Sequence, residues 1–223
     1  MTPSAVPSAP PEDVMRLMLA LRGSGVRDTR VLHAIESVPR ERFVNHAFLD
    51  RAYDDTALPI DCGQTISQPS VVARMTEALA VTDRCKVLEV GAGSGYQTAI
   101  LARLARRVYA IERHRPLVLT ARERLAGLNI TNVALRAGDG TRGWPEQAPF
   151  DRILVAAAAD DVPALLLEQL RPGGILVLPV GETDEVQTLL RIERTPDGLD
   201  YRELAEVLFV PLVEGLPDDE RRS

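Results

Sequence analysis

A short apolar run, Val87-Leu88-Glu89-Val90, leads directly into the glycine-rich segment Gly91-Ala92-Gly93-Ser94-Gly95. Glycine has no Cβ, so three glycines at alternate positions let the backbone turn sharply and approach a ligand closely. The spacing is one residue shorter than the G-x-G-x-x-G fingerprint, in which a helix N-terminus receives a pyrophosphate. The turn therefore predicts a ligand without a pyrophosphate, and the alternative is a tight strand-to-helix connection that binds nothing.

Two carboxylates downstream favour the first interpretation. Glu112 ends the next predicted strand, at about the separation from the glycines where an acid meets ribose hydroxyls in doubly wound folds. Asp139 follows the third predicted strand and is suited to accept a hydrogen bond from an adenine amino group. Singly, these residues are more often a solvated strand end and a turn aspartate. Together with the glycines they indicate a site for S-adenosylmethionine (AdoMet), which has no phosphate.

Short apolar runs alternate with helical patterns from residue 86 onward, which predicts a mostly parallel sheet with helices on both faces. We expect a Rossmann-like, doubly wound α/β fold that ends in an antiparallel hairpin. The predicted strands cover residues 86–90, 108–111, 133–136, 153–156 and 175–180, and the hairpin strands 186–194 and 201–212. The predicted helices between them cover about residues 95–104, 116–127 and 162–170.

The N-terminal third differs in pattern from the rest. Helices are predicted over residues 12–22, 28–38 and 40–49, and a further helix begins at Pro69. Residues 53–68 have neither helical nor strand periodicity and predict an irregular segment with a short extended piece. We expect one domain over residues 12–215, in which residues 12–68 form a helical and irregular N-terminal addition. The tails, 1–11 and 216–223, are expected to be disordered.

Charge and composition exclude several classes of protein. The formal charge of −6 disfavours a nucleic-acid binder, because affinity for phosphates needs a basic surface. The two cysteines, Cys62 and Cys85, are too few for a disulfide framework or a zinc site, so no metal is expected. The N-terminus lacks the pattern of a signal peptide, and no apolar run approaches the roughly 20 residues that span a bilayer. We expect a soluble, cytoplasmic monomer that binds neither nucleic acid nor membrane.

The chain closely resembles the protein-L-isoaspartate O-methyltransferases over roughly residues 12–215. The glycine turn is common to many methyltransferases, whereas the segment from Gly63 to Pro69 is specific to this family. The motifs that carry the resemblance, in chain order, are Leu58-Pro59-Ile60, Gly63-Gln64-Thr65-Ile66-Ser67-Gln68-Pro69, the turn with its strand up to Tyr96-Gln97-Thr98, Ile111-Glu112-Arg113, Gly138-Asp139-Gly140, Gly143-Trp144 and Ala148-Pro149-Phe150-Asp151-Arg152-Ile153.

This resemblance implies an enzyme that transfers a methyl group from AdoMet to the free α-carboxylate of L-isoaspartyl residues in damaged proteins, leaving S-adenosyl-L-homocysteine. The resulting ester would close to a succinimide without further catalysis, which starts repair. The implied catalytic residue is Ser67, which would lie between the AdoMet methyl group and the acceptor carboxylate. From the residues alone, Ser67 has a second interpretation as the N-cap of the helix that begins at Pro69.

The resemblance also implies the binding residues. For the cofactor these are Glu89, Gly91, Ala92, Gly93, Ser94, Gly95, Glu112, Arg113, Gly138, Asp139 and Gly140. For an extended substrate peptide they are Thr65, Ile66, Ser67, Ala156, Ala157, Val210, Pro211 and Leu212. The sequence departs from the common family pattern at Ala156 and Asp160, which puts the shape of the peptide groove in doubt but not the methyl transfer.

The chemistry requires no general base, because an α-carboxyl with an ordinary pKa of about 3.5 is already ionised at neutral pH. His33, His46 and His114 are accordingly interpreted as surface or structural histidines. Trp144 and Tyr53 are candidate pocket walls, although core packing is the better interpretation of the tryptophan. Two alternatives remain open: a different acceptor, such as a dedicated biosynthetic peptide or a tRNA base, and an AdoMet-binding regulatory module without catalysis.

Overall fold

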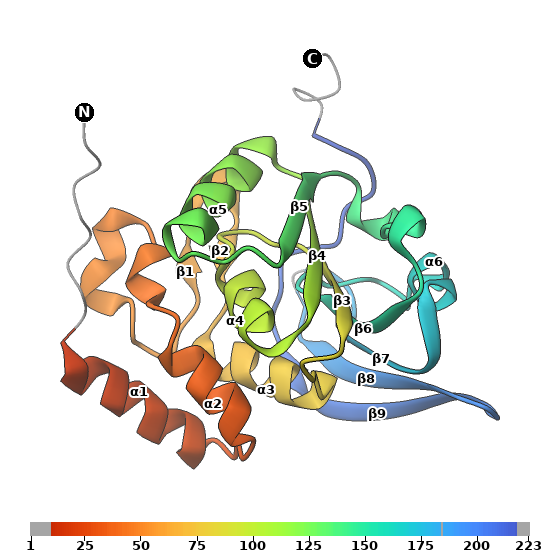
Figure 1. Ribbon diagram of the computed structural model, residues 1–223, viewed down its shortest axis with the longest axis horizontal. Helices are drawn as coiled ribbons and strands as arrows, with labels where there is room; N and C mark the ends of the chain where they lie inside the picture. The colour runs from red at the N-terminus through yellow and green to blue at the C-terminus, as the bar shows by residue number, and fades with distance from the viewer. Residues whose placement is uncertain (1–9, 184, 218–223) are drawn as a thin grey trace.

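A seven-stranded sheet forms the centre of the computed structural model, which describes residues 10–183 and 185–217 (Figure 1). The strand order is β5-β4-β3-β6-β7-β8-β9, with β8 antiparallel to both of its neighbours and the other pairs parallel. The predicted fold class, a mostly parallel α/β sheet with a C-terminal antiparallel hairpin, is confirmed. The strands are β3 (Lys86–Val90), β4 (Arg107–Glu112), β5 (Val133–Ala137), β6 (Phe150–Val155), β7 (Leu170–Val180), β8 (Gln187–Thr195) and β9 (Gly198–Val207).

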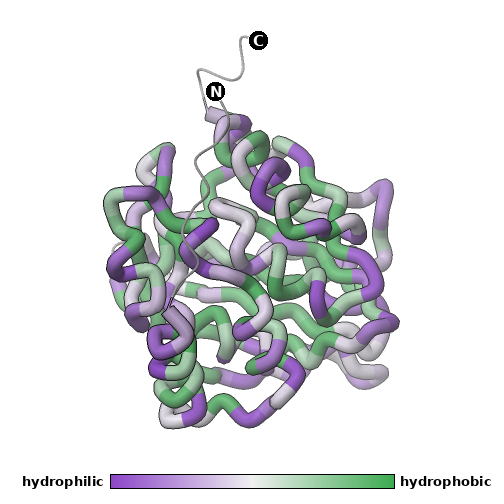
Figure 2. Tube along the Cα trace, turned by 60° about the vertical axis from the view of Figure 1, so that its left-hand side comes forward, coloured by the Kyte–Doolittle hydropathy of each residue, from purple (hydrophilic) through white to green (hydrophobic). Residues whose placement is uncertain are grey.

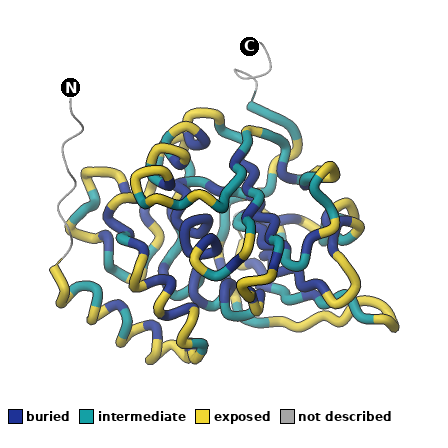
Figure 3. The backbone as a smooth tube through the Cα atoms, in the orientation of Figure 1, coloured by how far each residue is buried: buried dark blue, intermediate teal, exposed yellow. Residues whose placement is uncertain are grey.

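Helices cover both faces of this sheet. They are α1 (Pro11–Gly23), α2 (Thr29–Glu36), α3 (Pro69–Leu79), α4 (Tyr96–Leu104), α5 (Arg115–Gly127) and α6 (Ala164–Glu168). On β3, Val87 packs in the same cluster as Leu79 of α3 and Leu101 of α4, whereas Leu88 packs in the cluster of Leu166 from α6. Because both faces are covered, most residues of the central strands are apolar and buried, and the hydropathy and burial colouring show the corresponding segments inside the molecule (Figures 2 and 3).

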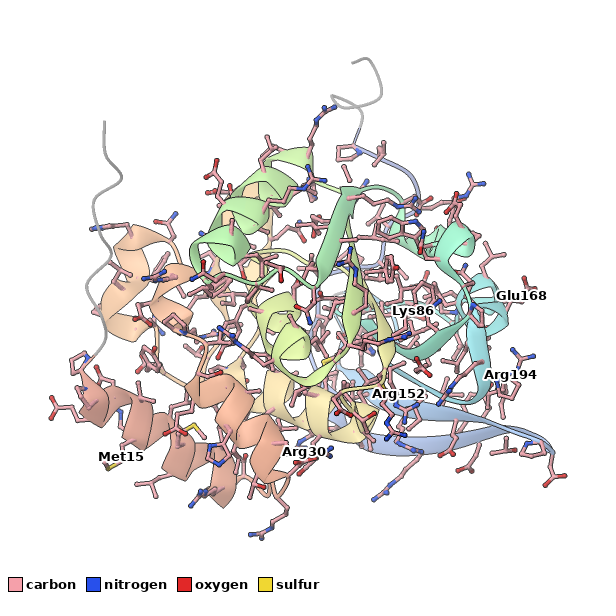
Figure 4. All side chains as sticks on the ribbon, in the orientation of Figure 1. Met15, Arg30, Lys86, Arg152, Glu168 and Arg194 are labelled. Carbon is pink, nitrogen blue, oxygen red and sulfur yellow. The ribbon has the colours of Figure 1, made fainter. Side chains whose placement is uncertain are left out.

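Three arginines hold the C-terminal end of α3. Arg191, Arg152 and Arg30 donate from three separate elements to the backbone carbonyl oxygens of the last helical turn, of the C-cap residue and of the residue after it, at 3.1, 3.2 and 3.4 Å. Arg30 and Arg152 are labelled beside the helix in Figure 4. Guanidinium groups suit this position because the last carbonyls of a helix have no partners within it and carry partial negative charge. The anchoring fixes α3, whose opposite end begins two residues after Ser67.

The helix predicted over residues 40–49 is wrong. The segment forms two short 3₁₀ helices, Arg40–Arg42 and His46–Arg51. Asn45 separates them because its side chain accepts a hydrogen bond from the N–H of Ala47 and thereby caps a new helix in place of continuing the old one. The segment predicted to be irregular, 53–68, contains two short antiparallel strands, β1 (Leu58–Pro59) and β2 (Thr65–Ile66), which form the acceptor hairpin.

The last predicted strand, 201–212, also needs correction because β9 already ends at Val207. Residues 208–217, here called the C-terminal strap, leave the sheet edge and cross to the loop after β6. There Ala158 donates to the carbonyl of Val210 at 2.8 Å and accepts from the N–H of Leu212 at 2.6 Å. Pro211 lacks an N–H and is unsuited to continue a ladder. The strap therefore passes over the carboxyl ends of the parallel strands.

Several smaller boundaries also differ from prediction. The strands predicted over 153–156 and 175–180 begin earlier, at Phe150 and Leu170. The helix predicted over residues 162–170 is shorter, at Ala164–Glu168, because Leu170 already pairs with Phe150 as the first residue of β7. At the N-terminus, α1 includes Pro11, which was assigned to the tail. Pro10, Leu216 and Pro217 of the two predicted tails are described and lie in no helix or strand, whereas residues 1–9 and 218–223 lie outside the described residues. Within the described ranges, no helix is long and apolar enough to cross a membrane.

Candidate active site

A cavity opens at the carboxyl ends of β3, β4 and β6. Its floor is the glycine turn after β3, and the C-terminal strap covers it. The lining comes from Gln64, Thr65, Val90, Gly91, Gly93, Ile111, Glu112, Arg113, Gly140, Ala156, Ala157, Val210, Pro211, Leu212 and Val213. Open parallel sheets bind ligands at this edge, and the chain brings glycines and a carboxylate together there.

The glycine turn adopts a backbone shape that other residues resist. Gly91 has φ of +85°, and a Cβ on it would lie 3.4 Å from the carbonyl oxygen of Ala156. Gly95, with φ of +89°, begins α4, and a Cβ there would lie 3.1 Å from the Cβ of Ala121. The N–H of Gly91 donates to the carbonyl of Ile111 at 2.8 Å, which ties the turn to β4. The close packing explains why glycine stands at these two positions.

Glu112 lies in the cavity wall and also supports the turn. Its Oε2 accepts a hydrogen bond from the N–H of Gly93 at 2.8 Å, and its Oε1 accepts from the N–H of His114 at 2.9 Å. The side chain is almost fully buried. A carboxylate offers about four lone-pair sites, so two remain for a ligand that carries hydroxyl groups. Glu112 is thus positioned both to shape the turn and to meet a ligand in the cavity.

Asp139 faces away from the cavity, whereas its neighbour Gly140 lines it. Its Oδ1 accepts from the N–H and the hydroxyl of Thr141 at 2.9 and 2.6 Å, and its Oδ2 accepts from the N–H of Gly215 at 2.9 Å. Burial raises the pKa of Asp139, but the hydrogen bonds from Thr141 and Gly215 outweigh it and hold that pKa below its usual value. In this structure Asp139 fastens the C-terminal strap, and no atom of it reaches the cavity lining.

Glu89 lies in neither the cavity nor its extensions. It is fully buried on the face of β3 that α4 covers, and neither carboxylate oxygen has a hydrogen-bond partner among the described residues. Burial raises the pKa of Glu89 to about 8, against a smaller opposing effect from Thr98. The carboxyl group is therefore mostly protonated at neutral pH. Gly95 and Gly138, which the sequence also assigned to the cofactor, are absent from the cavity lining.

Ser67 lies in a smaller pocket that adjoins the cavity, here called the throat. The throat shares Thr65, Gly91, Gly93 and Ala156 with the cavity. The remainder of its lining is Ile66, Ser67, Val72, Ala92, Ser94, Tyr96 and Gln97. The chain thus brings Ser67 and the glycine turn to one crevice, although they are more than twenty residues apart in the sequence.

The alternative interpretation of Ser67 as a helix N-cap is wrong. The N-cap of α3 is Gln68, and its side chain makes no capping hydrogen bond. Among the described residues, the Ser67 hydroxyl has no hydrogen-bond partner. It is therefore free to bond a ligand in the throat.

An open groove extends from Ser67 to the surface. It shares Thr65 and Ser67 with the throat and is otherwise mostly apolar. Val186 and Leu208 stand at its edge with exposed fractions of 66% and 73%, although they are large apolar side chains. The rest of the lining is Thr56, Ala57, Gln68, Val71, Glu206, Val207 and Phe209. An extended peptide fits such a groove, with its reactive group directed into the throat.

The residues that the sequence assigned to the peptide are divided between two places. Thr65, Ile66 and Ser67 line the throat or the groove, whereas Ala156, Ala157, Val210, Pro211 and Leu212 line the cavity. The segment of the C-terminal region that meets the groove is the end of β9 and the start of the strap. The backbone of Ala158 already bonds to the strap through both its N–H and its carbonyl.

Several residues that the sequence analysis considered for the site make structural contacts outside it. His33 pairs with Glu36, and His114 is the N-cap residue of α5. Trp144 packs edge-on against Tyr109, with ring centroids 5.4 Å apart, so its predicted core role is confirmed, whereas Tyr53 donates to the carboxylate of Glu41. Neither aromatic residue lines the cavity, the throat or the groove. No group of His, Cys, Asp or Glu side chains suited to a metal occurs in the described part of the chain.

One residue near the site had no sequence signal. Arg124 of α5 donates to the carbonyl of Ser94 at 3.1 Å and so holds the glycine turn from outside. Burial lowers the pKa of Arg124, and the charge of Asp61 in the acceptor hairpin opposes this. Arg124 thus stands between the turn and the hairpin, in a contact that only the packing of α5 creates.

Comparison with known proteins identifies close relatives. The family model for protein-L-isoaspartate(D-aspartate) O-methyltransferase matches residues 12–216. The protein-L-isoaspartate O-methyltransferase of Paracoccus denitrificans is 60% identical over 205 residues, which cover 92% of this chain and 95% of that protein. That of Paramagnetospirillum magneticum is 56% identical over 207 residues, which cover 92% and 97%.

Solved structures give the same result. A protein-L-isoaspartate O-methyltransferase superposes with a TM-score of 0.81 at 28% identity, over 94% of this chain and 68% of that one. The protein-L-isoaspartate O-methyltransferase beta-aspartate methyltransferase of Plasmodium falciparum, solved with S-adenosyl-L-homocysteine, has a TM-score of 0.78 at 27% identity, over 90% and 98%.

Proposed function

This chain belongs to the protein-L-isoaspartate(D-aspartate) O-methyltransferase family, and we propose that it methylates the free α-carboxylate of L-isoaspartyl residues in proteins. AdoMet is the methyl donor, and S-adenosyl-L-homocysteine is the product that remains. The methyl ester then closes to a succinimide, which begins the return to a normal aspartyl linkage.

One observation carries the proposal. Ser67 and Thr65 line both the throat that adjoins the glycine-floored cavity and the apolar groove that leads to solvent. A small donor in the cavity and a polypeptide in the groove would meet at this point. Because the Ser67 hydroxyl has no hydrogen-bond partner among the described residues, it is free to bond the reacting group of the polypeptide there.

The residues of the cavity fit AdoMet. Glu112 keeps lone pairs for ribose hydroxyls, and Gly91 and Gly93 line the cavity without side chains. Arg113 and Gly140, which line the cavity, are proposed for the adenine end of the site, and Ala92 and Ser94 for the end toward the throat. Gly138 and Asp139 do not line the cavity, and we propose that they shape the adenine end through the adjoining backbone of Gly140 and the strap. Glu89 acts indirectly in this assignment, because it is buried behind the turn that binds the cofactor.

The protein's contribution to the chemistry is mainly positioning. AdoMet supplies an electrophilic methyl group on a positively charged sulfonium. The acceptor carboxylate is already ionised at neutral pH, so no residue has to remove a proton. In the proposal the Ser67 hydroxyl donates a hydrogen bond to one carboxylate oxygen and orients the other toward the methyl group. A peptide bound over the throat would exclude water, which would otherwise solvate the carboxylate and weaken its attack.

The proposed substrate is an extended segment of an unfolded or damaged protein. Thr65, Ile66 and Ser67 would contact the isoaspartyl residue, and Ala156, Ala157, Val210, Pro211 and Leu212 would enclose it from the cavity side. An isoaspartyl residue differs from an aspartyl residue in routing the main chain through its side-chain carboxyl group. The throat must therefore recognise the path of the chain as well as the charge. We take the working form to be a cytoplasmic monomer without nucleic-acid partners.

The test is methylation of two peptides that differ only in the isoaspartyl or aspartyl linkage. With AdoMet labelled in its methyl group, base-labile label is expected on the isoaspartyl peptide and not on the aspartyl one. Equal labelling of both peptides would reject the isoaspartyl assignment. Ester on a dedicated peptide or methylation of tRNA would favour another acceptor, and AdoMet binding without any product would favour a regulatory module.

A further inference from the structure

The first turn of α3 is capped by a residue from a different part of the chain. Helix N-termini leave backbone N–H groups without partners, and side chains at the N-cap usually satisfy one of them. Here the N-cap residue Gln68 does not do so. The N–H of Ser70 instead donates to Oδ1 of Asp55 at 2.8 Å. Asp55 lies fifteen residues upstream, in the turn that precedes the acceptor hairpin.

The Asp55 carboxylate also accepts a hydrogen bond from a second residue next to Ser67. Oδ2 of Asp55 accepts a hydrogen bond from Nε2 of Gln68 at 3.1 Å. The two bonds together fix the residue directly after Ser67 and the residue three positions after it. Because the Ser67 hydroxyl has no partner of its own among the described residues, nothing on its side chain fixes its direction. The backbone that carries it is held from one side by β2 and from the other by Asp55.

The turn that carries Asp55 is itself anchored to the interior. The guanidinium of Arg40 is fully buried, stacks 4.8 Å from the centre of the Tyr96 ring, and donates through Nη2 to the carbonyl of Thr56 at 3.4 Å. Burial lowers the pKa of Arg40, and both Tyr96 and Asp55 favour its charged form. Tyr96 also lines the throat. The Asp55 turn and one wall of the throat therefore share a common buried support.

Asp55 is exposed in the free protein, where water competes for both of its hydrogen bonds. Its neighbours Thr56 and Ala57, together with Gln68, line the groove. A peptide that lies in the groove would displace water from this region and strengthen the two bonds. Their effect is therefore expected in the complex with the acceptor more than in the free protein.

We propose that Asp55 is a positioning residue, which fixes the direction of the Ser67 hydroxyl through Gln68 and Ser70. This inference rests on the proposed function, since it assigns Asp55 a part in the same methyl transfer. If Asp55 acts in this way, kcat depends on the hydrogen bonds that residue 55 accepts and not on its negative charge.

Four variants test whether the hydrogen bonds or the charge of residue 55 affect kcat. Asp55→Ala removes both acceptors, and we expect kcat on the isoaspartyl peptide to fall about tenfold. Asp55→Asn keeps an oxygen for Ser70, and its amide can donate to Gln68 once that side chain turns over, so kcat should stay within about threefold of wild type. Gln68→Glu sets two carboxylates against each other and should lower kcat. Combining it with Asp55→Asn restores a donor and an acceptor and should recover most of the loss.

The matched control is Asp54→Ala. Asp54 is adjacent in sequence and makes a surface ion pair with Arg51, with side chains about half exposed, so its loss should leave kcat unchanged. For every variant, the affinity for S-adenosyl-L-homocysteine and the melting temperature are measured beside kcat and KM. A simple helix cap would lower the melting temperature and leave kcat alone, whereas a positioning residue lowers kcat with cofactor affinity retained.

Failure of the proposed function and failure of the inference about Asp55 give different results. If the wild-type protein makes no ester on the isoaspartyl peptide, the proposed function fails and the inference fails with it. If the wild type is active and Asp55→Ala keeps its kcat within twofold, only the inference is overturned. It is likewise overturned if Asp55→Asn loses as much as Asp55→Ala, because charge and not hydrogen bonding would then be the cause. The double variant decides the matter should Asp55→Ala fail to fold.

Discussion

The carboxylate of Glu112 accepts a hydrogen bond from the backbone N–H of Gly93 at 2.8 Å. The end of one strand thus holds the glycine turn that follows the neighbouring strand. The arrangement joins two sequence features that predict the same ligand into a single structural unit. Loss of either one is expected to damage the cavity that both of them line.

Replacing Glu112 by Ala should weaken AdoMet binding strongly. The N–H groups of Gly93 and His114 lose their acceptor, and an unsatisfied group of this kind costs roughly 1 to 3 kcal/mol when buried. We expect at least a tenfold increase in the Kd for S-adenosyl-L-homocysteine, measured by calorimetry. Glu123→Ala, on the exposed side of α5, is the control and should bind normally. Equal affinities in the two variants would contradict the role of Glu112.

Gly91→Ala should impair the cofactor site through backbone strain. Gly91 has φ of +85°, a region that costs other residues roughly 1 to 2 kcal/mol, although the added Cβ would meet Ala156 at an ordinary contact distance of 3.4 Å. We expect a loss of cofactor affinity together with a lower melting temperature. Gly23→Ala, at the end of α1 with open space around it, should be neutral or slightly stabilising. A variant at Gly91 with wild-type affinity would show that the turn does not need glycine there.

Ser67→Ala tests the acceptor side alone. The hydroxyl has no hydrogen-bond partner within residues 10–183 and 185–217, so its removal should change stability little. In the complex with the peptide, the substitution removes one hydrogen-bond donor to the carboxylate. Removal of such a donor lowers kcat by a factor on the order of 10² to 10³. Affinity for S-adenosyl-L-homocysteine should be retained. Turnover equal to that of wild type on the isoaspartyl peptide would mean that Ser67 has no part in the transfer.

Glu89 makes the stability of the protein depend on pH. Burial raises the pKa of Glu89 to about 8 in the folded protein from an ordinary 4.5, so the folded state binds this proton more tightly than the unfolded state. The stability that the proton contributes is fully present below pH 4.5 and is lost as the pH rises toward 8, at about 1.4 kcal/mol per pH unit.

Glu89→Gln has nothing to titrate at this position. Its free energy of unfolding should therefore rise relative to wild type as the pH increases toward 8, and the difference should level off above that. Urea unfolding of both proteins across this range measures the effect, with Glu123→Gln as the control. Parallel pH profiles for wild type and Glu89→Gln would refute the raised pKa.

The sequence predicts the sheet and the turn because their causes are local. Buried strands need continuous apolar runs, and a positive φ at Gly91 needs glycine, so both can be recognised from neighbouring residues. The break at Asn45 was missed because a capping side chain competes with a helical pattern that is otherwise acceptable. The early end of β9 was missed because the strap gains its partner, Ala158, only in the folded chain.

The same distinction holds within the site. The sequence predicts that Glu112 and Ser67 lie at the top of the sheet, since a strand end and a recognisable motif place them. It does not predict that Asp139 bonds Gly215, that Arg124 supports Ser94, or that Asp55 caps α3. Each of these contacts joins segments at least fifteen residues apart, and no local pattern encodes them. They depend on the packing of the N-terminal addition and the strap over the sheet.

The most direct measurement is a crystal structure with S-adenosyl-L-homocysteine and an isoaspartyl peptide bound together. We predict that the cofactor product fills the cavity above Gly91 and Gly93, with its sulfur toward the throat, and that the peptide lies in the groove. The isoaspartyl α-carboxylate should lie within hydrogen-bond distance, roughly 3 Å, of the Ser67 hydroxyl. A carboxylate bound out of reach of Ser67, or a cofactor product bound elsewhere, would contradict the account.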